Sequence, residues 1–239
     1  MTAPTAPNPT AVPPPAPTWL RVGATVAARR LRPPVGSRRR RTVCGAARVL
    51  TGLGVRVEVR APGTAWPRTG TGLLLVSNTS TALDPLALLT AVPGAVLAGG
   101  PDRLAGVPMP TVPADPARVA AALRAGTPVS ARAGADAALL AAAVDAGAAV
   151  CPVAVRWRGA ASPPPAGRST VAAMRWLAAS PGTVVEVHLL PALYSAGATP
   201  QELGTTAGHA VAAVLEGGLA AGSRREPASG GGQRGPSTR

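Results

Sequence analysis

Apolar segments that favour strands alternate with helix-forming segments throughout residues 54–217. The run 72–78, GLLLVSN, is almost uninterrupted in its apolar character, which is typical of a central strand covered on both faces. Residues 55–60 instead alternate valine with charged side chains, as in a strand with one covered face. Because strands and helices alternate, the sequence predicts a single α/β domain with a mixed or mostly parallel central sheet flanked by helices.

Helix start signals mark where several of the intervening helices begin. Asp84 and Asp115 each stand before a proline, a pair that suits an acidic cap followed by the first helical position. Thr199 and Glu202 form a capping box that opens the last helix, which we expect to end near Leu215 because glycines follow. These signals place helices between the predicted strands, as an α/β domain requires.

The composition divides the chain into four regions. Residues 1–18 are rich in proline and alanine and are expected to be disordered, as are the Gly/Ser/Arg-rich residues 218–239. Residues 19–53 mix apolar and arginine side chains in a pattern that predicts a basic amphipathic helical arm. The predicted α/β domain occupies the remaining residues, 54–217.

Positive charge is concentrated toward the two ends of the chain. The 239 residues include 24 basic residues, all of them arginine, and 10 acidic residues, for a formal net charge of +14. Most of the excess lies within residues 1–60, where Glu58 is the only acid. A basic arm suits an anionic partner, either a lipid surface or a nucleic acid. The arginine codons of a GC-rich genome would produce the same bias without any partner.

The arm favours an anionic membrane surface over a nucleic acid. Trp19 stands among apolar and arginine residues, as in helices that lie on lipid surfaces. The arm lacks interleaved aromatic residues and any helix-turn-helix, zinc or RNA-recognition signature. The sequence shows no signal-peptide core and no uncharged apolar run of about 18 residues, so no signal peptide or transmembrane helix is predicted. We therefore expect a cytoplasmic protein bound peripherally at the inner face of the cell membrane.

The segment after the apolar strand, SNTSTALDPL, carries the most specific motif. It resembles the phospholipid/glycerol acyltransferases, which acylate lysophosphatidate and carry Asn-His-x-Ser-x-x-Asp-Pro after a similar strand. Asn78, Asp84 and Pro85 occupy matching positions, and Thr79 stands where the family has its catalytic histidine. The resemblance covers most of residues 45–216 and is greatest to short actinobacterial members. It implies a glycerolipid acyltransferase-like fold and a role in phospholipid biosynthesis.

The resemblance also implies a set of site residues and substrates. Asp84 takes the place of the catalytic aspartate, while Asn78, Ser80 and Gly134 are candidates for binding substrate. The family's arginine for the acceptor phosphate has no counterpart by motif. Arg103, Arg118 or Arg132 could supply this charge, and Arg132 is the candidate for binding substrate. The implied reaction moves a fatty acyl group from acyl-CoA or acyl carrier protein to lysophosphatidate. The family's Phe-Pro-Glu-Gly-Thr motif is replaced by SARAGAD at residues 130–136, in which only Gly134 corresponds and the glutamate is missing.

The residue at position 79 decides what chemistry this motif can perform. Acyl transfer to a glycerol hydroxyl needs a base, and imidazole suits this role because its pKa lies near neutrality. The hydroxyl of Thr79 does not accept a proton at neutral pH, and loss of a general base typically costs ~10²–10⁴ in rate. Without the histidine, a structural role for Asp84 as a helix cap accounts for its presence.

Two functions therefore follow from the resemblance. The chain is either an acyltransferase or a catalytically inactive relative that binds lipid or membrane as a regulatory or scaffold protein. His188 lies in a predicted strand and His209 within the last predicted helix, and both positions indicate structural roles. Cys44 and Cys151 form no metal-binding motif with them, so neither a metal nor another cofactor is predicted.

Overall fold

The computed structural model describes residues 37–63, 66–67, 72–78, 80–132, 137–159 and 169–223. The predicted N-terminal tail, the first part of the predicted basic arm and residues 224–239 of the predicted C-terminal tail lie outside these residues. So do two of the candidate site residues, Thr79 and Gly134.

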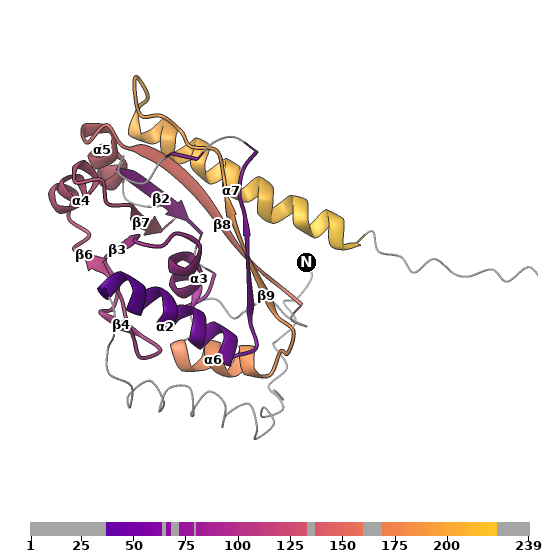
Figure 1. The fold of residues 1–239 in the computed structure, drawn as a ribbon. Coiled ribbons are helices and arrows are strands. Elements are labelled where there is room, and N and C mark those ends of the chain that lie inside the picture. Colours follow the sequence, from indigo (N-terminus) through magenta and orange to yellow (C-terminus); the bar gives the residue numbers. More distant parts are fainter. Residues whose placement is uncertain are drawn as a thin grey trace, which may run out of the picture.

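A seven-stranded sheet forms the centre of the protein (Figure 1), in the order β1-β9-β8-β2-β7-β3-β6. The strands β8, β2, β7, β3 and β6 are parallel to one another, whereas β9 pairs antiparallel with β8 and parallel with β1. The predicted mixed, mostly parallel sheet is confirmed. The strands are β1 (Arg56–Arg60), β2 (Leu73–Ser77), β3 (Val96–Ala98), β6 (Thr111–Val112), β7 (Val129–Arg132), β8 (Ala149–Arg158) and β9 (Val184–Leu189).

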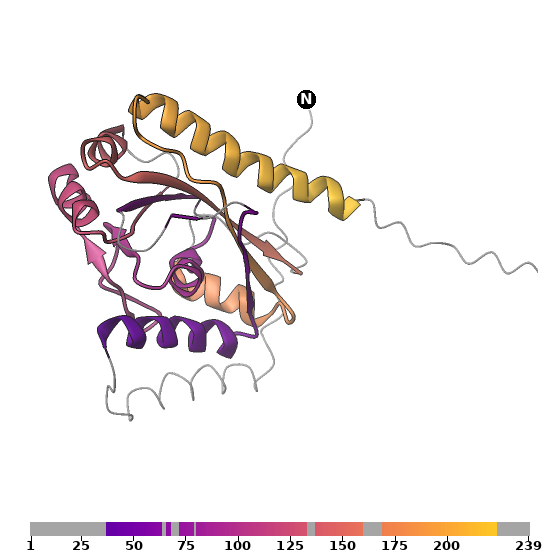
Figure 2. The ribbon, with the colours of Figure 1, turned by 45° about the horizontal axis from the view of Figure 1, so that its top comes forward.

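Helices cover both faces of this sheet, so the domain has three layers (Figure 2). One face carries α2 (Arg38–Gly52), α3 (Asp84–Ala91) and α6 (Thr170–Ala178). The other carries α4 (Pro116–Arg124), α5 (Ala137–Asp145) and α7 (Pro200–Ser223). The flanking helices that the alternating pattern predicts are therefore present on both faces.

The central strand β2 connects the two hydrophobic cores. All five of its residues are buried. Leu73 and Leu75 point into the core beside α2, α3 and α6, while Leu74 and Val76 point into the core beside α4, α5 and α7. The continuous apolar run in the sequence is explained by this position, because both faces of the strand are shielded from water.

The helix α2 belongs to the folded domain, although the sequence pattern places residues 38–52 in the basic arm. Ser37 caps it by accepting a hydrogen bond from the backbone N–H of Arg40 at 3.3 Å. Ala46, Val49 and Leu50 are buried in the core against α3, while Cys44 faces solvent. The second part of the predicted arm is therefore a structural layer of the domain.

Three local features differ from the sequence-based expectations. α7 continues through its glycines to Ser223 instead of ending near Leu215, so residues 218–223, which were expected in the disordered tail, are helical. The two-stranded hairpin β4 (Arg103–Leu104) and β5 (Val107–Pro108) was not predicted. Its turn residues Ala105 and Gly106 have φ angles of 48° and 75°, as in a tight hairpin turn in which both central residues are left-handed. The sequence does not indicate this turn, because its first central position carries alanine where glycine, asparagine or aspartate is usual.

The third difference concerns the start of α3. Asp84 does not cap this helix as the sequence predicts, because the cap position belongs to Leu83, whose side chain accepts no hydrogen bond from the first helical N–H groups. Asp84 is instead the first helical residue, and Pro85 follows it. Among the described residues, no helix combines the length and hydropathy that crossing a membrane requires.

A close approach between β2 and α4 generates a stability prediction. A Cβ atom at Gly72 would lie 2.2 Å from the backbone oxygen of Leu123, so Gly72→Ala forces the helix away from the strand. We expect the substitution to lower the free energy of unfolding by about 1–3 kcal/mol, as overpacked core sites do. Gly208→Ala in α7 is the matched control, since its added Cβ meets open space and alanine is the better helix former. Equal denaturation midpoints for the two variants would contradict the prediction.

Candidate functional site

A cavity of about 380 Å³ opens where the carboxyl ends of several parallel strands meet. Ser77, Ala98 and Arg132, the last residues of β2, β3 and β7, line it together. Binding sites in α/β sheets form at this edge, because the connections to the next elements diverge there. The fold therefore places the cavity directly beside the motif that the sequence analysis singles out.

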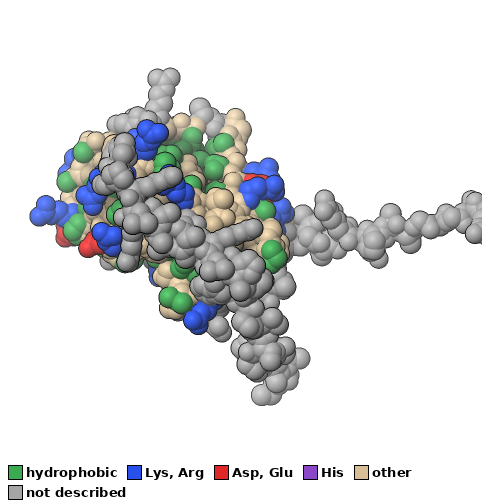
Figure 3. Space-filling view, turned by 60° about the horizontal axis from the view of Figure 1, so that its bottom comes forward, with side chains coloured by type: hydrophobic (Ala, Val, Ile, Leu, Met, Phe, Trp, Pro, Cys, Tyr) green, Lys and Arg blue, Asp and Glu red, His purple; other side chains and the backbone are tan. Residues whose placement is uncertain are grey.

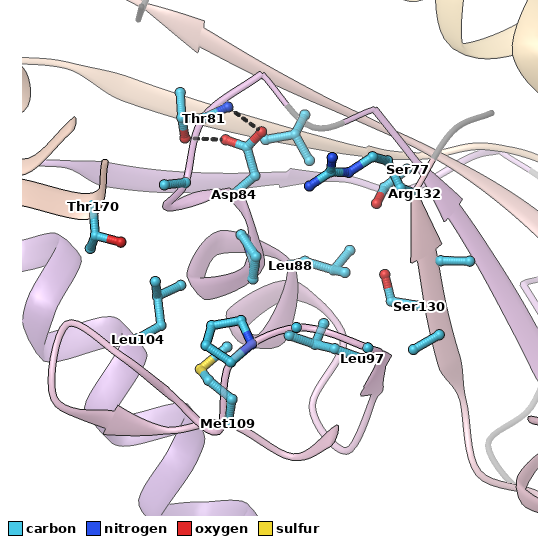
Figure 4. Close-up of a pocket in the computed structure, with 18 residues that line it drawn as sticks. Ser77, Thr81, Asp84, Leu88, Leu97, Leu104, Met109, Ser130, Arg132 and Thr170 are labelled. Atoms are coloured by element: carbon cyan, nitrogen blue, oxygen red, sulfur yellow. Dashed lines mark hydrogen bonds between the residues drawn. The ribbon is translucent and has the colours of Figure 1, made fainter. Parts of the chain in front are cut away.

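The cavity is mostly apolar but has polar groups on two sides (Figure 4). Asp84 and Thr81 lie at one end, and Ser77, Ser130 and Arg132 lie along the sheet. Leu104 of the β4–β5 hairpin, Met109 just after it and the loop residues 99–101 before it complete the wall, so the unpredicted hairpin forms part of the cavity. The apolar lining includes Leu88, Leu97, Leu104, Met109 and Val155.

The carboxylate of Asp84 organises the turn between β2 and α3, and its residue is only 2% exposed. Its Oδ2 accepts hydrogen bonds from the backbone N–H groups of Ser80 at 2.5 Å and Thr81 at 2.9 Å, and from the Ser80 hydroxyl at 3.2 Å. Its Oδ1 accepts from the Thr81 hydroxyl at 2.5 Å and from Nε1 of Trp157 at 2.8 Å. Both oxygens are therefore engaged, and uncharged donors hold the carboxylate in place.

Trp157 joins this turn to the neighbouring strand β8. Its ring also packs edge-on against Trp176 of α6, with centroids 6.4 Å apart and an interplanar angle of 80°. The sequence analysis did not select Trp157, because nothing in a linear pattern shows that position 157 reaches back to position 84. The indole N–H of Trp157 therefore links Oδ1 of Asp84 to strand β8 of the sheet.

Asn78 continues the pairing of β2 with β8 beyond the last strand residue. Its Oδ1 accepts from the backbone N–H of Val155 at 2.7 Å, and its Nδ2 donates to the Val155 carbonyl at 2.9 Å. Neither Asn78 nor Ser80 is among the residues that line the cavity. Their predicted contact with substrate stays a prediction, and the contacts present in the structure are with the protein itself.

Of the predicted binding residues, Arg132 is the one that the structure places at the cavity. It is exposed, and it pairs across the sheet with Ser77 of β2. Within the described part of the chain, its guanidinium has no hydrogen-bond or ion-pair partner. Thr79 and Gly134 lie outside the described residues, so their predicted roles are not tested.

Neither histidine lines the cavity. His209 lies on an exposed position of α7. His188 lies on β9, where Nε2 is 3.4 Å from an oxygen of Glu186, a residue only 3% exposed. Glu186 also forms ion pairs with Arg158 at 3.0 Å and Arg60 at 3.5 Å. The structural roles expected for the histidines are consistent with these positions, which supply no imidazole to the cavity.

Two buried groups have shifted pKa values. Burial raises the pKa of Glu186, but the hydrogen bond from His188 and the charges of Arg158, His188 and Arg156 outweigh this effect and lower it overall. Burial raises the pKa of the Cys151 thiol to about 12, so this cysteine remains protonated within the sheet. Among the described residues, no group of three or more histidine, cysteine, aspartate or glutamate side chains could hold a metal ion.

The fold is similar to that of a solved structure, the 1-acyl-sn-glycerophosphate (LPA) acyltransferase PlsC from Thermotoga maritima. The TM-score is 0.54 at 14% sequence identity, and the match covers 84% of this chain and 97% of that chain. No family model and no curated protein sequence matches this chain. The structural likeness confirms the acyltransferase-like fold that the motif resemblance implies.

The hydrogen bonds of Asp84 generate a second prediction. In Asp84→Asn an amide NH₂ replaces one acceptor and faces groups that already donate, so buried donors lose their partners. We expect the free energy of unfolding to fall by about 1–3 kcal/mol. Asp115→Asn is the matched control, because asparagine caps a helix about as well as the exposed Asp115 does. Chemical denaturation of both variants checks this, and an equal loss in the two would contradict it.

The lowered pKa of Glu186 generates a prediction about acid stability. A carboxyl with a lowered folded-state pKa stabilises the fold above its ordinary value of 4.5, and this contribution disappears as the pH falls through the folded-state value. Glu186→Gln should therefore flatten the loss of stability below pH 4.5, measured by denaturation across the acid range. Glu202 also has a lowered pKa, through its backbone and side-chain hydrogen bonds with Thr199, and retains its contribution in both proteins. An unchanged pH profile would contradict the prediction.

Proposed function

We propose that this protein binds the substrates of glycerolipid acyl transfer in the Asp84 cavity. These substrates are the fatty acyl chain of an acyl-CoA or acyl carrier protein thioester and a lysophosphatidate acceptor. The observation that carries the proposal is an apolar cavity at the carboxyl ends of β2, β3 and β7, in a fold similar to that of an LPA acyltransferase. The role is that of an acyltransferase-fold protein in phospholipid biosynthesis.

The lining of the cavity supports an acyl ligand. Its volume of about 380 Å³ lies within the range of small-molecule pockets, roughly 300–1,000 Å³. Leu88, Leu97, Leu104 and Met109 offer apolar contacts to a hydrocarbon chain, and each buried methylene contributes about 0.8 kcal/mol. The polar lining residues lie mainly along the sheet and at the Asp84 end, with Thr170 of α6 beside Leu104, so a hydrocarbon chain and a polar head would meet different parts of the wall.

Acyl transfer itself requires a proton acceptor. The glycerol hydroxyl forms a bond to the thioester carbonyl carbon, its proton passes to a base, and the carbon–sulfur bond breaks as the thiol leaves. Among the described residues, Asp84 is the only acid or histidine that lines the cavity, and both of its oxygens already accept hydrogen bonds. Any transfer by this chain therefore proceeds without an imidazole base and is slow.

Binding without transfer is the second candidate function. The observation that favours it is the set of uncharged donors around Asp84, which gives this residue a structural task independent of catalysis. The basic arm would then hold the protein on anionic lipid at the inner membrane face. Exposed arginines, which are more frequent than acidic side chains on the face shown in Figure 3, fit such a surface.

Restoring the histidine separates these functions. We expect the unmodified protein to bind acyl-CoA and lysophosphatidate, and Thr79→His to transfer the acyl group faster by at least about 10²-fold, the usual contribution of a general base. The assay follows labelled acyl groups from acyl-CoA and from acyl carrier protein. Thr205→His, on an exposed position of α7, is the matched control and should leave the rate unchanged.

Two further variants test whether Asp84 supports the restored base. Adding Asp84→Ala to Thr79→His should abolish the gain, since an aspartate must orient the imidazole and stabilise its charged form. Adding Trp157→Phe should increase the gain, because it frees Oδ1 of Asp84 from the indole. Fast transfer by the unmodified protein, lost in Asp84→Ala, would overturn the view that the chain lacks a working base. An absence of substrate binding in every form would overturn the proposed function.

A further inference from the structure

Two serine hydroxyls on the cavity wall have no partner within the described part of the chain. Ser77 is 4% exposed and Ser130 is 6% exposed, and both line the cavity. Proteins leave few buried polar groups unpaired, because such groups give up their bonds to water. An unpaired hydroxyl that faces a cavity is therefore available to a ligand.

The sheet places these hydroxyls next to each other and beside a cation. β2 and β7 are parallel neighbours, with Leu75 opposite Ser130 and Ser77 opposite Arg132. The two serines and Arg132 consequently lie on one face of adjacent strands, in diagonal and direct register. Figure 4 shows all three on the same side of the cavity, with the Arg132 side chain extending toward the Asp84 end.

The part of the wall opposite these three polar residues is mainly apolar. Leu88 of α3 and Leu104 and Met109 of the hairpin region are apolar, and Leu97 continues this surface on the sheet beside Ser130. Asp84 also borders the cavity, but its carboxylate is turned toward its own donors and Trp157. A cation and two hydroxyls thus face a mainly apolar surface across the cavity, in which Thr170 of α6 is the polar residue beside Leu104.

We propose that Ser77, Ser130 and Arg132 form an oxyanion subsite that binds the head group of a single-chain anionic amphiphile. The two hydroxyls donate to the oxyanion, the guanidinium donates two parallel hydrogen bonds and supplies the charge, and the alkyl chain lies against Leu88, Leu97 and Met109. A phosphate monoester and a fatty carboxylate share this chemistry. This inference rests on the proposed function, since it assigns the polar end of the same lipid-binding cavity.

Calorimetry with the full chain and three ligands of equal chain length tests the subsite. The ligands are dodecyl phosphate, dodecanoate and the neutral dodecanol. We expect the favoured anion to bind at least about tenfold more tightly than dodecanol, the effect of hydrogen bonds to a charged group. The comparison of phosphate with carboxylate identifies which oxyanion the subsite prefers.

Variants of the three residues show whether they cause this preference. Ser77→Ala, Ser130→Ala and Arg132→Gln should each bring the anion and dodecanol affinities closer together, while Arg124→Gln, an exposed arginine on α4, should retain the full difference. Without ligand, the two serine variants should unfold at an equal or higher denaturant concentration than the unmodified protein, because each loses an unpaired buried hydroxyl. A hydroxyl with a structural partner would have the opposite effect.

The outcomes distinguish failure of the subsite from failure of the cavity. Equal affinity of the unmodified protein for dodecyl phosphate, dodecanoate and dodecanol would overturn the subsite and leave chain binding in place. Retention of the anion preference in all three variants, or loss of stability in both serine variants, would also overturn it. Binding of none of the three ligands would overturn the proposed function and the subsite together.

Discussion

The burial of β2 on both faces is the constraint from which the arrangement of the domain follows. A strand whose five residues are all shielded from water must lie in the middle of a sheet, with a helical layer on each side. β8 and β7 pair with its two edges, and both are parallel to it, so their connections must cross over the sheet as helices. The cavity is a consequence of this arrangement, because the neighbouring parallel strands end at the same edge.

The end of β2 is fixed by side chains instead of by further strand pairing. The side-chain amide of Asn78 forms hydrogen bonds with the backbone of Val155. The carboxylate of Asp84 accepts hydrogen bonds from the backbone of the β2–α3 turn and from the indole of Trp157. Together these contacts attach the β2–α3 turn to β8. They fix the shape of the cavity rim, and they give Asn78 and Asp84 structural roles in a chain with threonine at position 79.

Most of the fold could be predicted from the sequence, because its signals are local. Periodicity and capping residues within a few positions are enough to predict the alternating strand β1, the apolar strand β2 and the capped helices α4 and α7. The misses have physical causes that local patterns do not contain. α7 passes through glycines that usually end helices, and Ala105 adopts the left-handed conformation that glycine or asparagine normally takes. Asp84 looks like a helix cap in sequence, yet its side chain turns back to Ser80 and Thr81.

The candidate site was less predictable than the fold, since a site is made by residues distant in sequence. The motif pointed to Asp84 and to the end of β2, where the structure has a cavity, and Arg132, one of the arginines considered for binding a phosphate, also lines that cavity. Ser77 and Ser130 gave no signal, because a serine in an apolar strand is noticed only when the sheet register shows that it faces a cavity. Trp157 likewise becomes meaningful only through its contact with Asp84.

Asp84 has a task in the fold that does not depend on a neighbouring histidine. In a histidine-dependent site an aspartate both orders its own turn and receives the imidazole, and these tasks use different lone pairs of one carboxylate. Here the turn contacts of Oδ2 are complete, and Oδ1 is shared by the Thr81 hydroxyl and the Trp157 indole. Neutral donors thus satisfy the buried carboxylate without a charged partner. The presence of the aspartate is therefore accounted for by the fold of the turn, and by itself it is no evidence for catalysis.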